Sequence, residues 1–220
     1  MNDTPVPPVR RRLAAEERRS QILAAARKLF IEEGVEKTSM RRIASLAGVT
    51  PTLIYHHFAD KEALLLTVCQ AFFRGLIEAN EAAIGMVPDE DEPFARLRRQ
   101  LEGYVRFGLA NRDVYRLVFM TPLASLVRSR LPAGHRPHDD APPEDLGFGT
   151  QAFGMLEGEI ARLIASGHLK SGDPAAIAEV VWATGHGLVS LMITHGDFKW
   201  TPFEQLLSQS IDTILNGIAA

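Results

Sequence analysis

Two short segments with helical periodicity, separated by a glycine, limit the possible folds of this chain more than any other part of it. The apolar residues of the first segment are spaced as on one face of a helix: Met40, Ile43, Ala44 and Ala47. Thr38 or Ser39 is the expected N-cap of this helix, and Gly48 its expected end. A second helix is expected from Thr50-Pro51, with the threonine as cap and the proline at the first helical position. Two helices joined by so short a turn form the helix-turn-helix arrangement, which presents the start of its second helix to the major groove of DNA.

The residue types within this unit suit a tight crossing of two helices. Ala44 is small enough for the point where the helices meet, and Gly48 tolerates the positive φ of a sharp turn. Ile54 is expected to hold the second helix against the first. A plain helical hairpin is the alternative, because the Ala-x-x-x-Gly pattern is a weak signal by itself.

The rest of the chain also predicts helices, and no stretch shows the apolar–polar alternation of a half-buried strand. Further helices are expected at about 16–33, 61–85, 93–110, 112–119, 122–130, 148–166, 174–195 and from 201 to the end. Thr201, Pro202 and Glu204 predict a capping box, and Leu131–Gly147 predicts a mobile loop. The expected fold class is all-α: an amino-terminal three-helix helix-turn-helix domain plus a larger helical domain (about nine helices).

Charge is distributed unevenly along a chain whose formal net charge is −3. Residues 1–62 contain 11 Lys and Arg against 8 Asp and Glu, a net +3, whereas residues 63–220 contain 13 against 19, a net −6. The basic beginning favours a polyanion as partner, although chance produces differences of this size too. Arg10–Arg12 lies in a proline-containing segment that we expect to be a flexible arm, either solvated or placed near a minor groove.

Composition argues against several other classes. The single cysteine, Cys69, excludes an intramolecular disulfide and a zinc site that needs several Cys ligands. The chain has neither a run of about 18 apolar residues nor an apolar signal-peptide core, so we expect no membrane partner and a cytoplasmic location. We expect no metal and no cofactor. The one cluster with metal-ligand chemistry, His135, His138, Asp139 and Asp140, lies in the predicted mobile loop.

Residues 16–66 resemble the DNA-binding domain of the TetR family of transcriptional regulators. The matching pieces are Ile22–Phe30, Gly34, Thr38–Val49, Ile54–Phe58 and Asp60–Leu65, in the order and spacing of that family. Pro51-Thr52-Leu53 departs from the Lys-Gly-Thr or similar triplet often found in the recognition helix, which implies a different target sequence. The implied domains are a flexible basic arm (1–14), a DNA-binding domain (15–62) and a ligand-binding and dimerisation domain (63–220).

Residue roles follow by position from this resemblance. The residues expected to face phosphates are Ser39, Arg41, Tyr55, His56, His57 and Lys61, and those expected nearest the base edges are Thr50, Pro51, Thr52 and Leu53. Hydroxyls and imidazoles suit phosphate oxygens, whereas Thr and Leu offer methyl contacts to thymine. His57 can equally be structural. Because helix-turn-helix proteins usually read two half-sites one helical turn apart, we expect a homodimer on a pseudo-palindromic operator in double-stranded DNA.

The two carboxy-terminal helices are the expected dimer interface. The segment 174–195 is apolar around most of its circumference and contains Gly185 and Gly187, so it should be buried on more than one side. The last helix carries one apolar stripe: Leu207, Ile211, Ile214 and Ile218. Two such helices from each chain can form a four-helix interface, as in TetR-like proteins. Val181–Val189 and Tyr115–Met120 also resemble a TetR carboxy-terminal subgroup with a Trp…His-Gly signature.

Aromatic and Met side chains of the carboxy-terminal part are candidates for lining an effector site. The candidate residues are Phe72, Tyr104, Phe107, Tyr115, Phe119, Met120, Phe153, Trp182 and His186. Most of them can equally belong to the core, and a satisfied core histidine is the simpler interpretation of His186. The residue types predict a small, mainly apolar or aromatic effector with few charged anchors.

The sequence therefore predicts a TetR-like DNA-binding regulator, by family habit a repressor, that a small effector releases from its operator. An all-α ligand-binding enzyme is one alternative, although the chain contains no G-x-S-x-G, no H-E-x-x-H and no phosphate-binding glycine loop. A non-specific architectural DNA-binding protein is the other. A salt-dependent footprint on a discrete palindrome separates the three hypotheses.

Overall fold

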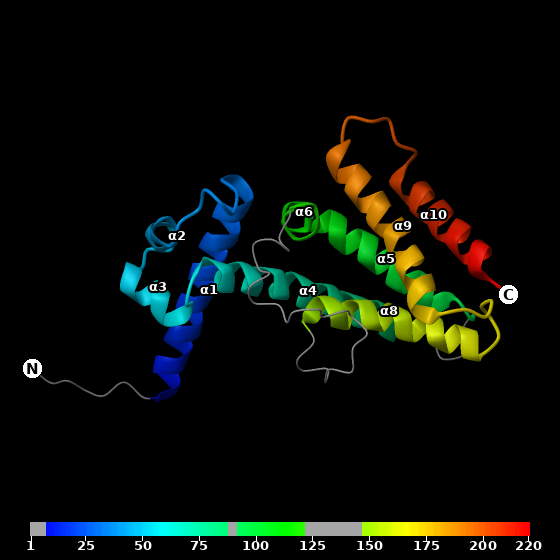
Figure 1. Ribbon diagram of the computed structural model, residues 1–220, viewed down its shortest axis with the longest axis horizontal. Helices are drawn as coiled ribbons and strands as arrows, with labels where there is room; N and C mark the ends of the chain where they lie inside the picture. Colours follow the sequence, from blue (N-terminus) through cyan, green and yellow to red (C-terminus); the bar gives the residue numbers. More distant parts are fainter. Residues whose placement is uncertain (1–7, 88–91, 122–146) are drawn as a thin grey trace, which may run out of the picture. The chain divides into compact units, whose positions relative to one another are not determined.

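The computed structural model describes residues 8–87, 92–121 and 147–220, and these residues contain nine α-helices and no strand (Figure 1). The helices are α1 (Pro8–Glu32), α2 (Met40–Leu46), α3 (Pro51–His57), α4 (Lys61–Gly85), α5 (Ala95–Ala110), α6 (Arg112–Met120), α8 (Phe148–Ala165), α9 (Pro174–Thr194) and α10 (Phe203–Ile218). The predicted all-α class is confirmed. The helix expected at 122–130 and the four residues of the candidate metal cluster lie outside the described residues.

The chain divides into two compact units, with breaks between Cys69 and Gln70 in α4 and between Arg116 and Leu117 in α6. The first unit contains α1, α2, α3, the first part of α4 and the end of α6. The second contains the rest of α4, α5, most of α6, α8, α9 and α10.

In the first unit, α2 and α3 are joined by a turn that depends on Gly48. Its φ of +66° is in the left-handed region. The N–H of Val49 donates to Ala44 O at 3.0 Å and the N–H of Gly48 donates to Ser45 O at 3.3 Å. This pair of bonds is a Schellman motif, which satisfies the last carbonyls of α2 and turns the chain sharply into α3.

Both short helices begin with side-chain caps. Ser39 Oγ accepts from the N–H of Arg42 at 3.2 Å, and Thr50 Oγ1 accepts from the N–H of Leu53 at 3.2 Å. Ser39 is thus the cap of α2, whereas the hydroxyl of Thr38 donates to Gly34 O at 2.7 Å. The apolar residues predicted to hold the unit together are buried: Ile22, Ala26, Leu29, Phe30, Ile43, Ala44 and Ile54.

In the second unit, α5 contacts α8, α9 and α10, and α9 and α10 lie side by side (Figure 1). Gly108 on α5 explains how closely α9 approaches, because a Cβ at Gly108 would lie 2.9 Å from Val189 Cγ1. Gly185 on α9 similarly faces the ring of Tyr104, 3.4 Å from where its Cβ would be. The interior glycine of α9 that packs inside the protomer is therefore Gly185.

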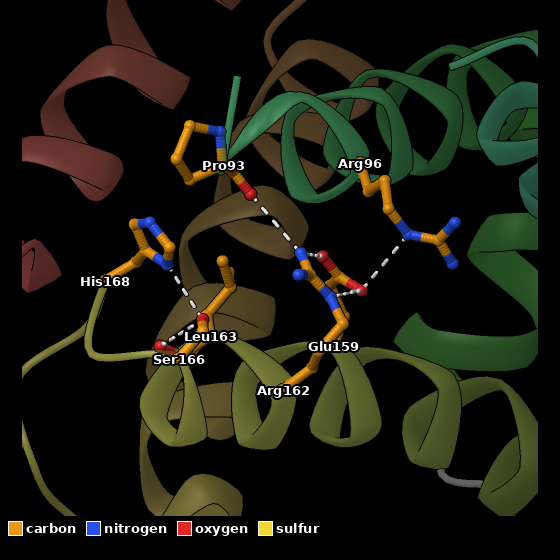
Figure 2. A network of polar contacts seen from close by, with 7 residues as sticks. All are labelled: Pro93, Arg96, Glu159, Arg162, Leu163, Ser166 and His168. Atoms are coloured by element: carbon orange, nitrogen blue, oxygen red, sulfur yellow. Dashed lines mark hydrogen bonds and ion pairs between the residues drawn. The ribbon is translucent and has the colours of Figure 1, made fainter. Parts of the chain in front are cut away.

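A buried carboxylate joins α5 to α8. Figure 2 shows Glu159 between the guanidinium groups of Arg96 and Arg162, at 3.4 Å and 2.6 Å. Arg162 also donates to Pro93 O at 3.3 Å, just before α5 begins. Two ion pairs join α5 to α10: Arg98–Asp212 at 2.5 Å and Arg106–Glu204 at 2.5 Å. Four arginines thus connect α5, or Pro93 shortly before it, to the neighbouring helices.

Two local expectations differ from the structure. The capping box at α10 is wrong: α10 begins at Phe203 without a side-chain cap, and Glu204 accepts from Arg106 of α5 instead of reaching back to the backbone. The helix α1 begins at Pro8, before the expected start near Glu16, because proline at the first position and the Arg, Leu and Ala that follow all permit a helix. Helix therefore covers half of the segment 1–14 that was expected to be an arm.

Candidate functional site

The start of α3 presents its side chains to solvent. Thr50, Pro51 and Thr52 are exposed, and Leu53 is half-buried. Behind them Ile54 is fully buried and holds α3 in place. The four residues expected to read bases therefore form one accessible turn on a firmly packed helix, which is the geometry that groove reading needs.

Most of the residues expected to contact phosphates are also exposed. Tyr55 is 54% exposed, and Ser39, Arg41 and His56 are exposed as well. The neighbouring Arg42 donates from Nη2 to Glu33 Oε1 at 3.0 Å, so its guanidinium is held against α1. Arg41 forms no ion pair with any described residue, so its charge is available for a phosphate.

Two of the expected phosphate ligands are placed differently. The ammonium of Lys61 donates to Val35 O at 2.8 Å and to Glu36 O at 3.3 Å, which closes the segment after α1. His57 is half-buried at the end of α3, beside the buried Phe58. Both placements give these residues a part in the fold of the unit, whether or not they also contact DNA.

Inside the second unit, four of the candidate effector residues form a hydrogen-bonded chain. The indole N–H of Trp182 donates to the Tyr104 hydroxyl at 3.1 Å. The hydroxyls of Tyr104 and Tyr115 are 2.8 Å apart, and that of Tyr115 is 2.6 Å from His186 Nδ1. When neutral His186 carries its proton on Nε2, each hydroxyl donates to the next group and the chain runs in one direction.

Burial determines the protonation states of the two tyrosine hydroxyls and of the His186 imidazole. Desolvation raises the pKa of the Tyr104 hydroxyl and strongly raises that of the Tyr115 hydroxyl, so both stay protonated. Desolvation also lowers the pKa of His186, because burial disfavours the imidazolium. The two hydroxyls and the imidazole are therefore neutral around pH 7.

Ring contacts bring the other candidates of this unit to the same place. The ring of Phe72 lies 5.2 Å from that of Phe107 and 6.2 Å from that of Tyr115, both edge-on. The Phe153 ring lies 6.1 Å from that of Trp182. Seven of the nine candidates thus form one connected cluster, whereas Phe119 and Met120 belong to the other unit.

One face of α9 is apolar and uncovered within the protomer. Val180 is 62% exposed and Leu191 47% exposed, and between them Ala183 is exposed. A Cβ at Gly187 would meet no atom within 4 Å, so a neighbour could approach the backbone there. By length and composition alone α9 resembles a membrane span, a test that core helices also pass, yet only 28% of its most apolar window is buried.

On α10, the predicted interface stripe divides between two environments. Leu207 and Ile211 are buried inside the protomer, whereas Ile214 and Ile218 are half-buried. The half-buried apolar residues of this helix are Phe203, Leu206, Ile214 and Ile218. Only Ile214 and Ile218 of the predicted stripe are thus left partly exposed, on the same helix as the half-buried Phe203 and Leu206.

Two interior residues were not among the sequence candidates. Asn80 on α4 and Gln100 on α5 are buried amides. Both stand where an apolar residue continues the helical stripe, since Asn80 follows Phe72 and Leu76 at intervals of four. A polar residue at such a position is the signal that would have identified them.

Both the amino-terminal and the carboxy-terminal part of the chain are similar to known protein families. Residues 22–68 match the family described as bacterial regulatory proteins, tetR family, and residues 97–214 match the tetracyclin repressor-like C-terminal domain. The transcriptional repressor Rv1474c of Mycobacterium tuberculosis is 31% identical over 180 residues, which cover 74% of this chain and 89% of Rv1474c. The transcriptional activator FasR of Mycolicibacterium smegmatis is 34% identical over 108 residues, 49% of this chain, and the chain spans about half (48%) of FasR.

The fold has solved counterparts as well. A putative tetR family regulator from Shewanella sp. PV-4 superimposes with a TM-score of 0.70 at 20% identity, covering 92% of this chain and 98% of that one. The Trp…His-Gly subgroup is not given by these matches and stays a prediction.

Proposed function

The chain belongs to the TetR family of bacterial regulatory proteins and is a DNA-binding transcriptional regulator, and on that premise we propose that it is a homodimeric repressor. In this proposal the dimer binds a pseudo-palindromic operator and a small, mainly apolar effector releases it. The observation that carries the proposal is the exposed first turn of α3, capped by Thr50 and held from behind by the buried Ile54.

The division of roles on α3 follows from chemistry and exposure. Thr50, Pro51, Thr52 and Leu53 face the bases, with methyl groups suited to thymine. Tyr55, His56, Ser39 and Arg41 face phosphates, which fix the register of the protein on the duplex. Lys61 instead holds the segment after α1 through its hydrogen bonds to Val35 O and Glu36 O. The half-buried His57 packs at the end of α3.

The apolar face of α9 supports a homodimer. A contiguous stripe of Val180, Ala183, Gly187 and Leu191 is costly to leave in water, and a second copy of the same helix covers it symmetrically. The half-buried apolar residues of α10 extend that surface. Dimerisation doubles the DNA contact, as two half-sites require.

Repression and an apolar effector rest on two further observations. The relative Rv1474c, whose alignment covers 74% of this chain, is named a repressor. The cluster around Tyr115 is aromatic and neutral, so it suits an uncharged ligand.

Selection of bound sequences from random duplexes, followed by footprinting, tests the proposal. We expect a discrete palindrome that is protected in a salt-dependent manner. With Tyr55→Phe, the loss of about 1 kcal/mol per half-site lowers the affinity for that palindrome about thirtyfold in a dimer. Thr52→Ala relaxes the sequence preference at one base of each half-site. The control is Ser171→Ala, which removes an exposed hydroxyl between α8 and α9 and should change neither the affinity nor the sequence preference.

A protein that protects no discrete site, or whose Tyr55→Phe and Thr52→Ala variants bind DNA like the wild type, contradicts the proposal. The direction of regulation is read separately, from expression of a reporter placed behind the selected palindrome. Higher reporter expression in the presence of the protein contradicts only the repressor role and leaves the DNA-binding part of the proposal standing.

A further inference from the structure

Inside the second unit, the oxygens of two amide side chains have no hydrogen-bond partner among the described residues. Asn80 and Gln100 are each 3% exposed. Neither Asn80 Oδ1 nor Gln100 Oε1 accepts a hydrogen bond from any residue that the structure describes. Buried polar groups in native proteins nearly always find partners, so two orphaned acceptors in one unit call for a physical explanation.

The positions of the two amides make their polarity unfavourable for folding. On α4, Asn80 continues the buried stripe of Phe72 and Leu76. On α5, Gln100 lies among the buried Leu97, Leu101 and Val105. An apolar residue of similar size would stabilise either position, and local violations of this kind are expected at functional sites.

Gly103 places the two amides along the same part of α5. A Cβ at Gly103 would lie 2.9 Å from Asn80 Oδ1, so the missing side chain is what admits this amide. Gln100 precedes Gly103 by three residues and Tyr104 by four, and residues at these spacings are neighbours on a helix surface. Gln100 therefore lies one helical turn from Tyr104, whose hydroxyl is hydrogen-bonded to that of Tyr115, and Asn80 lies against α5 at Gly103.

The residues around the amides determine what kind of molecule they suit. Leu76, Leu97 and Leu101 are buried apolar residues, and the ring of Phe107 lies one helical turn along α5 from Gly103. An ion would lose its hydration here without a counter-charge from these residues. A neutral group that both donates and accepts hydrogen bonds fits, because an amide offers an oxygen acceptor and N–H donors.

We infer that Asn80 and Gln100 form the polar end of an effector site that takes a neutral, apolar molecule carrying a hydroxyl group. This inference rests on the proposed function and names the ligand class of its effector. The hydroxyl O–H donates to one amide oxygen, and the hydroxyl oxygen accepts from an amide N–H. The apolar remainder of the ligand lies against the leucine and aromatic side chains.

Matched pairs of probes test the need for a hydroxyl. Binding of 1-decanol and methyl nonyl ether, and of 2-naphthol and 2-methoxynaphthalene, is measured by calorimetry and by thermal unfolding of the full-length protein. We expect at least one hydroxyl compound to bind at least about tenfold more tightly than its ether, because the ether leaves an amide oxygen unpaired. A wild-type protein that binds no hydroxyl compound, or shows no preference over the ether, overturns the inference.

Substitutions that remove the amides test the assignment to these two residues. Asn80→Leu and Gln100→Met, made together, should raise the Tm of the unliganded protein. They should also reduce the preference for the hydroxyl compound over its ether to less than about twofold, because both partners of the hydroxyl are removed. Gly103→Ala should reduce the preference by displacing Asn80 Oδ1. The control Gly158→Ala, on α8 with open space around its Cβ, should keep it.

The remaining outcomes are also decisive. An unchanged preference in Asn80→Leu and Gln100→Met overturns the inference whatever the Tm, and together with a lower Tm it means that the amides bind an ordered water only. Binding to the selected palindrome is measured on the same preparations. A wild-type protein that binds the palindrome but shows no hydroxyl preference contradicts this inference alone, whereas absence of a discrete DNA site contradicts the proposed function and leaves the amide site standing.

Discussion

At the scale of single residues, backbone conformation decides more than side-chain contact at the turn between α2 and α3. Gly48 has a φ of +66°, and a Cβ there would meet no atom within 4 Å. Any penalty for another residue therefore comes from the backbone alone. Gly158 on α8 also has open space around its Cβ, but its φ is not positive.

These two glycines predict opposite effects of one substitution. Gly48→Ala should destabilise the protein by about 1–2 kcal/mol, because Ala resists the left-handed region. Gly158→Ala should stabilise it by up to about 1 kcal/mol, because Ala is the better helix former. Urea unfolding of both variants checks this, and an equal sign for the two would show that Gly48 has another role.

His186 predicts a pH dependence of stability. Its pKa is lowered in the folded protein by desolvation, so the unfolded chain binds this proton more strongly. The stability that depends on neutral His186 is thus present above its unfolded pKa of about 6.5 and is lost as the pH falls through the folded value. The neighbouring Tyr115 stays protonated throughout because its pKa is raised.

The matched variant is His186→Gln, which cannot take up this proton. The difference in free energy of unfolding between wild type and variant should shrink as the pH falls from 7.5 to 5.0. The other six histidines are common to both proteins and cancel in this difference. Urea unfolding at both pH values measures it, and parallel pH profiles would contradict the expected titration.

At the scale of helices, α5 is the element around which the second unit is organised. It contacts α8, α9 and α10, and its arginines pair with Glu159, Glu204 and Asp212. These pairs differ in environment: Glu159 is buried, whereas Glu204 is exposed to solvent. The solvent around Glu204 screens its interaction with Arg106.

This contrast predicts unequal effects of removing charge. Glu159→Gln should lower the free energy of unfolding by about 1.5–3 kcal/mol, since it weakens charge-assisted bonds to two arginines in a buried setting. Glu204→Gln should leave the unfolding midpoint nearly unchanged. Denaturant titrations of the two variants in the same buffer provide the comparison, and equal losses would show that burial of Glu159 has no energetic consequence.

At the scale of the whole molecule, the decisive feature is the apolar face of α9. The protomer buries one side of this helix against α5, α8 and α10 and leaves Val180 and Leu191 in solvent. A soluble monomer seldom exposes such a stripe. The protein as it functions should therefore contain a second copy.

Leu191→Glu should yield monomers in sedimentation experiments, because a carboxylate cannot be buried unpaired in a symmetric interface. Its affinity for the palindrome should fall by about a hundredfold or more, through loss of the linked second half-site. Thermal unfolding should show a folded protomer, since Leu191 is already half in solvent. Ala82→Glu, on an exposed position of α4, is the control and should remain dimeric.

The sequence by itself determined what depends on local interactions. Helix ranges, the caps at Ser39 and Thr50, and the positive φ of Gly48 involve residues a few positions apart, so spacing and residue type suffice to predict them. The exposed turn of α3 followed from the same pattern, once the buried side of the helix was known to contain Ile54.

Only the tertiary structure decided which distant residues meet. Arg106 donates to Glu204, 98 positions along the chain, so Glu204 does not form the expected capping box. Tyr115 is hydrogen-bonded to His186, 71 positions along the chain. The orphaned amides of Asn80 and Gln100 became visible in the same way, because an unpaired group is recognised only when everything around it is placed. Periodicity identifies the face that a helix buries, whereas the partner on that face depends on how the helices pack.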